Sequence, residues 1–151
     1  MARKIYLIGS LRNPEIPLLA ERMRGEGHEV FDDWFCGGPE ADDHWRDYHR
    51  GRGHTFPEAM QHPMAKHIFS LDKHWLDWAD TAVMLTPCGK SGHLEMGYMA
   101  GTGKMTIAVV QDPERWDVMY QFLDAVVDDE DHLMGWLNKD YHTKRETTLV
   151  D

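Results

Sequence analysis

Residues 4–31, KIYLIGSLRNPEIPLLAERMRGEGHEVF, decide the fold of this chain. The apolar run at 4–10 ends in a glycine turn, which is typical of a buried strand. A helix is predicted over 14–27, because a proline suits its first turn, apolar residues recur along one face and glycines end it. Residues 28–31 predict a short second strand. A strand, a helix and a second strand in so short a stretch form a βαβ unit, which predicts a parallel sheet.

The remainder of the chain continues this alternation. Its 151 residues, 42% of them hydrophobic, suffice for one core, so a single domain over residues 1–151 is expected. Further strands are predicted at residues 81–86 and 104–110, and helices at 56–79 with a break near Pro63, at 93–102, at 115–127 and at 131–137. The sequence therefore predicts an α/β fold, a small doubly wound, flavodoxin- or Rossmann-like parallel sheet flanked by helices.

Two segments fall outside the alternation. Residues 32–56 are rich in aromatic residues, acids and glycine, and are predicted to form a long loop inserted at the active site, since such loops usually carry function. The aromatic residues Trp34, Phe35 and Trp45 could line the core or form a stacking wall for a flat ligand. Residues 139–151 form a polar tail, which could dock on a neighbouring subunit.

The composition excludes several classes of partner. With 16 Lys and Arg against 26 Asp and Glu, the net charge is −10, and no basic patch is present that would bind a nucleic acid polymer or an anionic membrane. No apolar run approaches the length of a membrane-spanning helix, and the N-terminus leads directly into a strand rather than a secretory signal. Two cysteines fit a reducing compartment, so a cytoplasmic location is expected.

Ligands of doubly wound sheets bind beyond the carboxyl ends of the strands. Three segments should meet there: residues 9–13, the loop after residue 31, and residues 87–95. Glu95 lies at the predicted start of a helix, just after a glycine-containing loop, where a carboxylate could act as a nucleophile at an electrophilic carbon. The alternative is a glutamate that only occupies the first helical turn, where the helix dipole favours it.

Two further side chains could serve the same cleft. Asp72 shares the apolar stripe of its helix with Ile68 and Trp75, so it needs a partner or a raised pKa. A structural hydrogen bond explains Asp72 equally well. The hydroxyl of Tyr6, near the end of the first strand, could reach a carboxylate in the cleft, although a core tyrosine is the commoner case.

The signal for a phosphate loop is weak. Gly89, Lys90 and Ser91 lie between a strand and a helix, but the phosphate-loop pattern needs a glycine where Met84 stands, so a nucleoside triphosphatase is not expected. Ser91 and nearby backbone amides at a helix N-terminus could still hold one phosphate or a hydroxyl.

The histidines give no clear metal motif. His44, His49 and His54 are five residues apart, as are His62 and His67, whereas two ligands on one helical face need a spacing of four. We therefore expect neither a metal nor another cofactor.

Three stretches of the chain resemble the nucleoside 2-deoxyribosyltransferase family. They are residues 4–10, residues 79–85 and residues 91–104, and the resemblance extends over the sheet framework from about residue 3 to residue 120. Its most specific part is the pattern E-x-G-Y-x-x-x-x-G-K from Glu95 to Lys104, which follows a strand led by an aspartate.

The resemblance implies a mechanism and a substrate class. In that family a glutamate at the position of Glu95 attacks the anomeric carbon of a deoxynucleoside and expels the nucleobase. The resulting deoxyribosyl ester is then attacked by a second base or by water. The residue matching Tyr6 orients the glutamate, and the one matching Asp72 handles the proton of the base. A segment resembling 117–120 completes the site of a neighbouring subunit, which implies a homodimer or a higher homo-oligomer with shared active sites.

The sequence also departs from the family pattern. Classical members place an acid, which holds the 5′ hydroxyl, where this chain has Gly89, whereas Ser10, Arg12 and Ser91 would suit a 5′ phosphate. A deoxyribosyltransferase that exchanges bases through Glu95 is the function that we expect. A related branch hydrolyses nucleoside 5′-monophosphates, so such a hydrolase stays open as an alternative, as does a non-catalytic nucleotide-binding module. The predicted substrate-binding residues are Gly9, Ser10, Arg12, Asp33, Trp34, Gly89, Ser91, Gly92, Asp117 and Met119.

Overall fold

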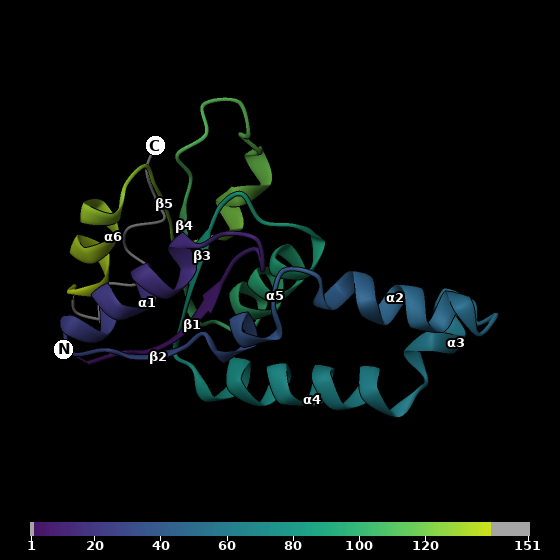
Figure 1. The fold of residues 1–151 in the computed structure, drawn as a ribbon. Helices are drawn as coiled ribbons and strands as arrows, with labels where there is room; N and C mark the ends of the chain where they lie inside the picture. The colour runs from purple at the N-terminus through teal and green to yellow at the C-terminus, as the bar shows by residue number, and fades with distance from the viewer. Residues whose placement is uncertain (1, 140–151) are drawn as a thin grey trace.

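A five-stranded parallel sheet forms the centre of the molecule, in a computed structural model that describes residues 2–139 (Figure 1). Its strand order is β2-β1-β3-β4-β5, and every neighbouring pair is parallel. This is the flavodoxin-like order, so the predicted α/β fold is confirmed. The strands are β1 (Lys4–Ile8), β2 (Glu29–Phe31), β3 (Thr81–Leu85), β4 (Met105–Val109) and β5 (Ala125–Val127).

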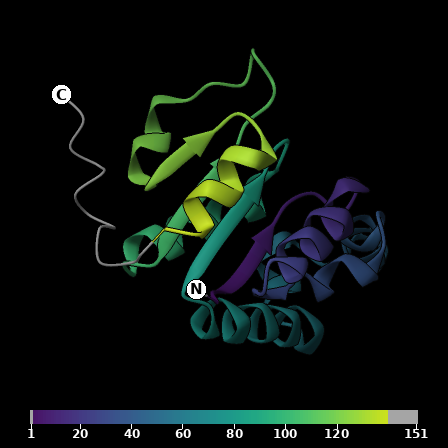
Figure 2. The same ribbon diagram turned by 90° about the vertical axis from the view of Figure 1, so that its left-hand side faces the viewer.

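Helices cover both faces of this sheet, as Figure 2 shows. Helices α1 (Glu15–Gly25) and α6 (Glu130–Leu137) pack on one face and share a core with residues such as Leu7 and Ile107. Helices α4 (Pro63–Trp78) and α5 (Lys90–Gly101) contribute to the core on the other face, which includes Tyr6 and Met84. Burial on both faces explains why β3 and β4 are apolar along almost their whole length.

The predicted loop at residues 32–56 is wrong, because most of this segment is helical. It contains a 3-10 turn η1 (Asp33–Gly37) and helix α2 (Ala41–Gly51), and α3 (Phe56–Met60) follows it. Helix α2 carries two acids in its first turn and basic residues in its last, which suits the helix dipole. Its inward face is aromatic rather than aliphatic, so it lacks the usual helical hydrophobic pattern.

Helices α2 and α3 and the N-terminal part of α4 form an arm that extends away from the sheet (Figure 1). The predicted break near Pro63 is confirmed, because α3 ends before it and Pro63 begins α4. Thr55 starts α3 with a capping box, in which its side chain accepts from the backbone of Glu58 and Glu58 accepts in return.

The predicted helix at 115–127 is also wrong. This segment holds only a 3-10 turn η2 (Val118–Phe122), and Ala125–Val127 then pairs with β4 as a fifth strand. The side chain of Asp117 accepts a hydrogen bond from the backbone of Met119, which supports a single turn. Leu123 returns to an extended conformation, so the valines after it join the sheet.

Helix α5 begins three residues earlier than predicted, at Lys90, so Ser91 and Gly92 belong to its first turn rather than to a loop. Gly92 is buried there, and a Cβ at this position would lie 1.9 Å from Sγ of Cys88 and 2.9 Å from Cγ2 of Ile8. Only glycine lets the helix approach the strand this closely.

The predicted tail at 139–151 lies, beyond Lys139, outside the described residues. Within the described part of the chain, no helix is long and apolar enough to cross a membrane.

Candidate active site

Tyr6 and Glu95 form the centre of the candidate site. Tyr6 lies on β1 in register with Ala82 of β3, and its side chain is 1% exposed. Its hydroxyl donates a hydrogen bond to the carboxylate of Glu95, which projects from the second turn of α5. Among the described residues, the other carboxylate oxygen, Oε2, is buried and has no hydrogen-bond partner. A buried oxygen of this kind costs free energy, which points to a role beyond packing.

The electrostatics of Glu95 follow from this position. Burial raises the pKa of Glu95 to about 7; the Tyr6 hydrogen bond opposes this increase, and the nearby Asp72 adds to it. The same surroundings raise the pKa of Tyr6, mainly through burial and then through the charge of Glu95, so Tyr6 remains a hydrogen-bond donor. A glutamate in water has a pKa of about 4.3, and burial is the main reason why Glu95 departs from that value.

Asp72 lies on α4, and it is close enough to influence Glu95 electrostatically. It is half-buried, and burial raises its pKa, as its place on the apolar stripe predicts. An aromatic series holds this part of α4 against the sheet. The ring of Phe31 stacks on Trp75 at 4.8 Å and contacts the ring of Tyr6 at 5.3 Å, centroid to centroid. Trp75 lies one turn from Asp72 on α4, so the packed rings connect the helix that carries Asp72 to Tyr6 on β1.

The distinctive pattern from Glu95 to Lys104 has a structural role that the sequence did not reveal. Tyr98 donates a hydrogen bond to the carboxylate of Asp77, and Lys104 donates to the backbone carbonyls of Asp77 and Ala79. Both side chains therefore bind the C-terminal end of α4 to the segment that carries Glu95. This arrangement fixes the position of Asp72 relative to Glu95.

The loop before α5 is joined to the segment after β4. His93 Nδ1 lies 2.8 Å from the carbonyl oxygen of Gly89, and its Nε2 lies 2.7 Å from the hydroxyl of Tyr120. The carbonyl can only accept, so Nδ1 carries the proton and Nε2 accepts from Tyr120. Asp117 and Met119 are exposed beside this link. Tyr120 and Asp117 also line a hollow of about 1040 Å³ beyond β4 and β5, which does not include Glu95.

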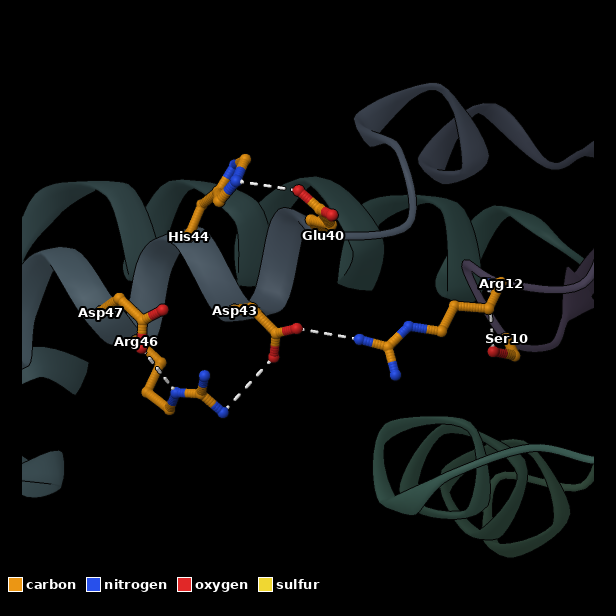
Figure 3. A network of polar contacts seen from close by, with 7 residues as sticks. All are labelled: Ser10, Arg12, Glu40, Asp43, His44, Arg46 and Asp47. Carbon is orange, nitrogen blue, oxygen red and sulfur yellow. Dashed lines mark hydrogen bonds and ion pairs between the residues drawn. The ribbon is translucent and has the colours of Figure 1, made fainter.

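The first loop contacts the arm. The hydroxyl oxygen of Ser10 accepts from the backbone of Arg12, and Nη2 of Arg12 lies 2.8 Å from Oδ2 of Asp43 on α2 (Figure 3). Arg12 is therefore already paired with a carboxylate. It also follows that α2 lies over the carboxyl end of β1, where a substrate would enter.

Of the remaining predicted residues, Trp34 and Gly9 have packing roles, whereas Asp33 and Ser91 are exposed. Trp34 donates from Nε1 to the carbonyl of Leu7 at 2.8 Å and packs against the cores on both sides of the sheet, so it lines the core. Gly9 lies where a Cβ would clash with Ile16, 2.3 Å from its Cδ1. Asp33 is exposed at the start of η1, and Ser91 is exposed in the first turn of α5.

The structure also reveals two groups of potential metal ligands. His49, His54 and His62 bring ring nitrogens to within 4.8 Å of one another. A second group brings two carboxylate oxygens and one ring nitrogen within the same distance at the molecular surface, from Asp128, Asp129 and His132. The histidine spacing excluded only a pair of ligands on one helical face. The cluster at His49, His54 and His62 is instead built by the end of α2, the residues before α3 and the start of α4.

The fold has a counterpart among solved structures, whereas no family model and no curated protein matches the sequence. A structure of a 2-deoxyribosyltransferase from the psychrotolerant bacterium Bacillus psychrosaccharolyticus aligns with a TM-score of 0.60. The alignment covers 95% of this chain and 96% of that chain, at 19% sequence identity. The two chains therefore share a fold along almost their whole length.

Proposed function

We propose that this chain is a nucleoside 2-deoxyribosyltransferase with Glu95 as its nucleophile. The observation that carries the proposal is the carboxylate of Glu95, with one oxygen bound to Tyr6 and the other buried without a partner among residues 2–139. Tyr6, Asp72 and Glu95 are the three residues selected from the sequence, and their proximity supports the choice. The shared fold with an enzyme described as a biocatalyst for nucleoside synthesis supports the reaction class.

The residues suit a double displacement at the anomeric carbon. The ionised carboxylate of Glu95 attacks this carbon, the bond from carbon to the nucleobase nitrogen breaks, and a deoxyribosyl ester forms. The transition state has oxocarbenium character, which an anionic carboxylate stabilises. Protonated Asp72 gives its proton to the departing base, and its raised pKa supports that role. A second base then attacks the ester carbon, returns a proton to Asp72 and frees Glu95.

The site supports a nucleoside better than a 5′-monophosphate. Arg12 was the best candidate for a phosphate ligand, but its guanidinium is paired with Asp43. A phosphate would have to displace this carboxylate or lie beside it, and like charges repel. Ser10 is likewise engaged with the backbone of Arg12. We therefore assign the 5′ hydroxyl form as the preferred substrate, with a free nucleobase as the second one.

The segment around η2 is the surface that we assign to a second copy of the chain. The segment around η2 exposes large apolar side chains on Trp116, Val118, Met119 and Phe122, and Trp116 is 80% exposed. Exposed apolar groups in one segment are typical of an interaction surface. We propose that this segment contributes Asp117 and Met119 to a site shared between subunits of a homo-oligomer.

Base exchange tests the proposal directly. The protein is incubated with deoxyinosine and adenine, and products are separated by chromatography. Deoxyadenosine is the expected product, and Glu95→Ala should abolish it in a folded protein. Release of hypoxanthine without deoxyadenosine would indicate a hydrolase. Nucleotide binding by calorimetry without any turnover would leave only a binding module, and normal exchange by folded Glu95→Ala would remove the mechanism.

A further inference from the structure

The end of α2 forms a turn that brings two histidines together. Gly53 has a φ of 78°, and its backbone N–H bonds to the carbonyl of Arg50, while the N–H of His54 bonds to that of His49. These two bonds define a Schellman motif, in which the residue after the glycine is placed against the residue five positions before it. Such a pair is usually apolar. Here both members are histidines, and their Nδ1 atoms lie 2.9 Å apart.

A third imidazole comes from the start of α4. His62 is the residue before Pro63, and its ring lies 4.4 Å from that of His54 and 4.9 Å from that of His49, centroid to centroid. One nitrogen from each ring lies within 4.8 Å of the others. Three imidazoles around a tetrahedral zinc ion have zinc–nitrogen distances of about 2.0–2.1 Å, which places the nitrogens roughly 3.3 Å apart. The nitrogens of this cluster lie within 4.8 Å of one another, and side-chain rotations that turn the stacked rings towards one point would give that spacing.

The cluster is partly enclosed by an aromatic side chain. His49 is 5% exposed, and the ring of Trp45 lies 5.4 Å from it. Arg52 is the nearby cation, and its guanidinium is occupied by the hydroxyl of Tyr48.

The cluster has no obvious alternative purpose. One hydrogen bond between His49 and His54 does not require a third ring stacked against them. The nearby carboxylate of Glu58 is committed to the capping box at Thr55, so it does not form an ion pair that would explain the group. In Figure 1 the C-terminal end of α2 and helix α3 lie at the tip of the arm, away from α5. The cluster is therefore separate from the site around Glu95.

We propose that His49, His54 and His62 form a binding site for a divalent transition metal, with zinc as the expected ion. Imidazole is a preferred ligand of zinc, and three histidines plus one water complete a tetrahedral shell. The ion ties the end of α2 to the starts of α3 and α4, three segments with few other links. Bound zinc therefore stabilises the arm whose other end positions Asp43 over the first loop.

Zinc binding by the untagged chain tests this site. The protein is stripped with a chelator, and zinc chloride is titrated in competition with a chromophoric chelator. We expect one tight equivalent, and a Kd raised at least about tenfold in His54→Ala and in His62→Ala. The matched controls are His44→Ala and His67→Ala, exposed histidines on the same two helices, and His132→Ala in the surface group of acids. These three variants should bind as the unmodified chain does.

Two further measurements keep the outcome clear if a variant folds poorly. Cobalt bound by the unmodified chain should give the intense visible absorption of a tetrahedral site, which needs no variant. Zinc should also raise the thermal midpoint of the unmodified chain but not that of His54→Ala. Absence of tight zinc binding by the unmodified chain would overturn the proposal. So would tight binding that survives in both His54→Ala and His62→Ala, or that is lost in His132→Ala instead.

Discussion

The hydroxyl of Tyr6 binds the carboxylate of Glu95, and this bond joins strand β1 to helix α5. The bond stabilises the ionised form of a carboxylate that burial disfavours. Burial raises the pKa of Glu95 and the hydrogen bond from Tyr6 lowers it, and the result is a pKa of about 7. A nucleophile in this state changes protonation in the range where most enzymes work, and this makes its role measurable.

Replacement of Glu95 should separate stability from activity. Because the folded-state pKa of Glu95 is raised, stability is lost as the pH increases from the ordinary glutamate pKa of about 4.3 to about 7. We expect Glu95→Gln to abolish base exchange and to increase the free energy of unfolding at about pH 8 by about 2 kcal/mol. The gain should shrink towards zero at about pH 4 and below, where the glutamate is protonated in the folded chain and largely protonated in the unfolded chain. Thermal denaturation of both proteins at both pH values provides the measurement. A Glu95→Gln variant that is less stable than the unmodified chain at about pH 8 would contradict the presence of a buried charge.

The pH dependence of kcat/KM should report the same group. Activity needs ionised Glu95, so we expect kcat/KM to fall on the acid side with a midpoint near the pKa of about 7. Tyr6→Phe removes the hydrogen bond that lowers this pKa, so the midpoint should move to higher pH. Asp72→Asn leaves the departing base without its proton donor, so it should lower kcat more than it weakens substrate binding.

A matched control distinguishes this effect from general damage. Tyr48→Phe also removes a tyrosine hydroxyl, but that hydroxyl lies on α2 and accepts from Arg52. Its acid midpoint should therefore stay where it is in the unmodified enzyme. Equal shifts in Tyr6→Phe and Tyr48→Phe would show that Tyr6 has no special relation to the nucleophile.

Lys104 is expected to act by positioning. Its ammonium group binds backbone carbonyls at the end of α4, so Lys104→Met leaves these carbonyls without their charged donor. We expect a loss of about 1 kcal/mol in stability. We also expect a larger fall in kcat than in substrate affinity, because Asp72 moves relative to Glu95. Steady-state kinetics with deoxyinosine and adenine would measure the split between kcat and KM.

Lys73→Met is the control for this prediction. Lys73 binds the exposed carboxylate of Asp77 at 2.7 Å on the surface of the same helix. Exposed pairs of this kind contribute little, so stability and kcat should change only slightly. A similar loss of kcat in both variants would mean that the charge near α4, rather than its position, governs the reaction.

The fold was predictable from the sequence where the signals were local and aliphatic. The strand at 4–8, the glycine-ended helix after it and the break at Pro63 all follow from periodicity and turn residues. Helix α2 was missed because its inward face uses Trp45 and His49, which do not form an aliphatic stripe. Strand β5 was missed because three residues carry too little pattern, and its pairing with β4 decides its conformation.

The candidate site was predictable in its residues but not in its electrostatics. Asp72 and Glu95 were identified from their places on helices, yet the pKa of Glu95 depends on how deeply Tyr6 and α4 bury it. The histidine cluster shows the same limit. His49 and His54 are five residues apart, and only the turn at Gly53 makes them neighbours. A glycine just after a helix was the signal in the sequence that could have indicated this contact.

The pairing of Arg12 with Asp43 leads to a prediction about substrate choice. Nη2 of Arg12 lies 2.8 Å from Oδ2 of Asp43, so the arginine is neutralised at the loop where a 5′ substituent is expected (Figure 3). Asp43→Asn removes this carboxylate charge and frees the guanidinium for a phosphate. We expect KM for deoxyinosine 5′-monophosphate to fall by about tenfold, which corresponds to about 1.4 kcal/mol. KM for deoxyinosine should change little.

Asp47→Asn is the control for charge alone. Asp47 lies on the same helix, one turn after Asp43, and it pairs with Nε of Arg46 at 2.9 Å rather than with Arg12 (Figure 3). The Asp47→Asn substitution removes one carboxylate charge, as Asp43→Asn does, but it does not free Arg12. The KM values for deoxyinosine and for its 5′-monophosphate should therefore remain near those of the unmodified enzyme. Arg12→Gln combined with Asp43→Asn should cancel the gain, because the phosphate then has no guanidinium to bind. If the gain persists without Arg12, the phosphate is held elsewhere and Asp43 acts only through repulsion.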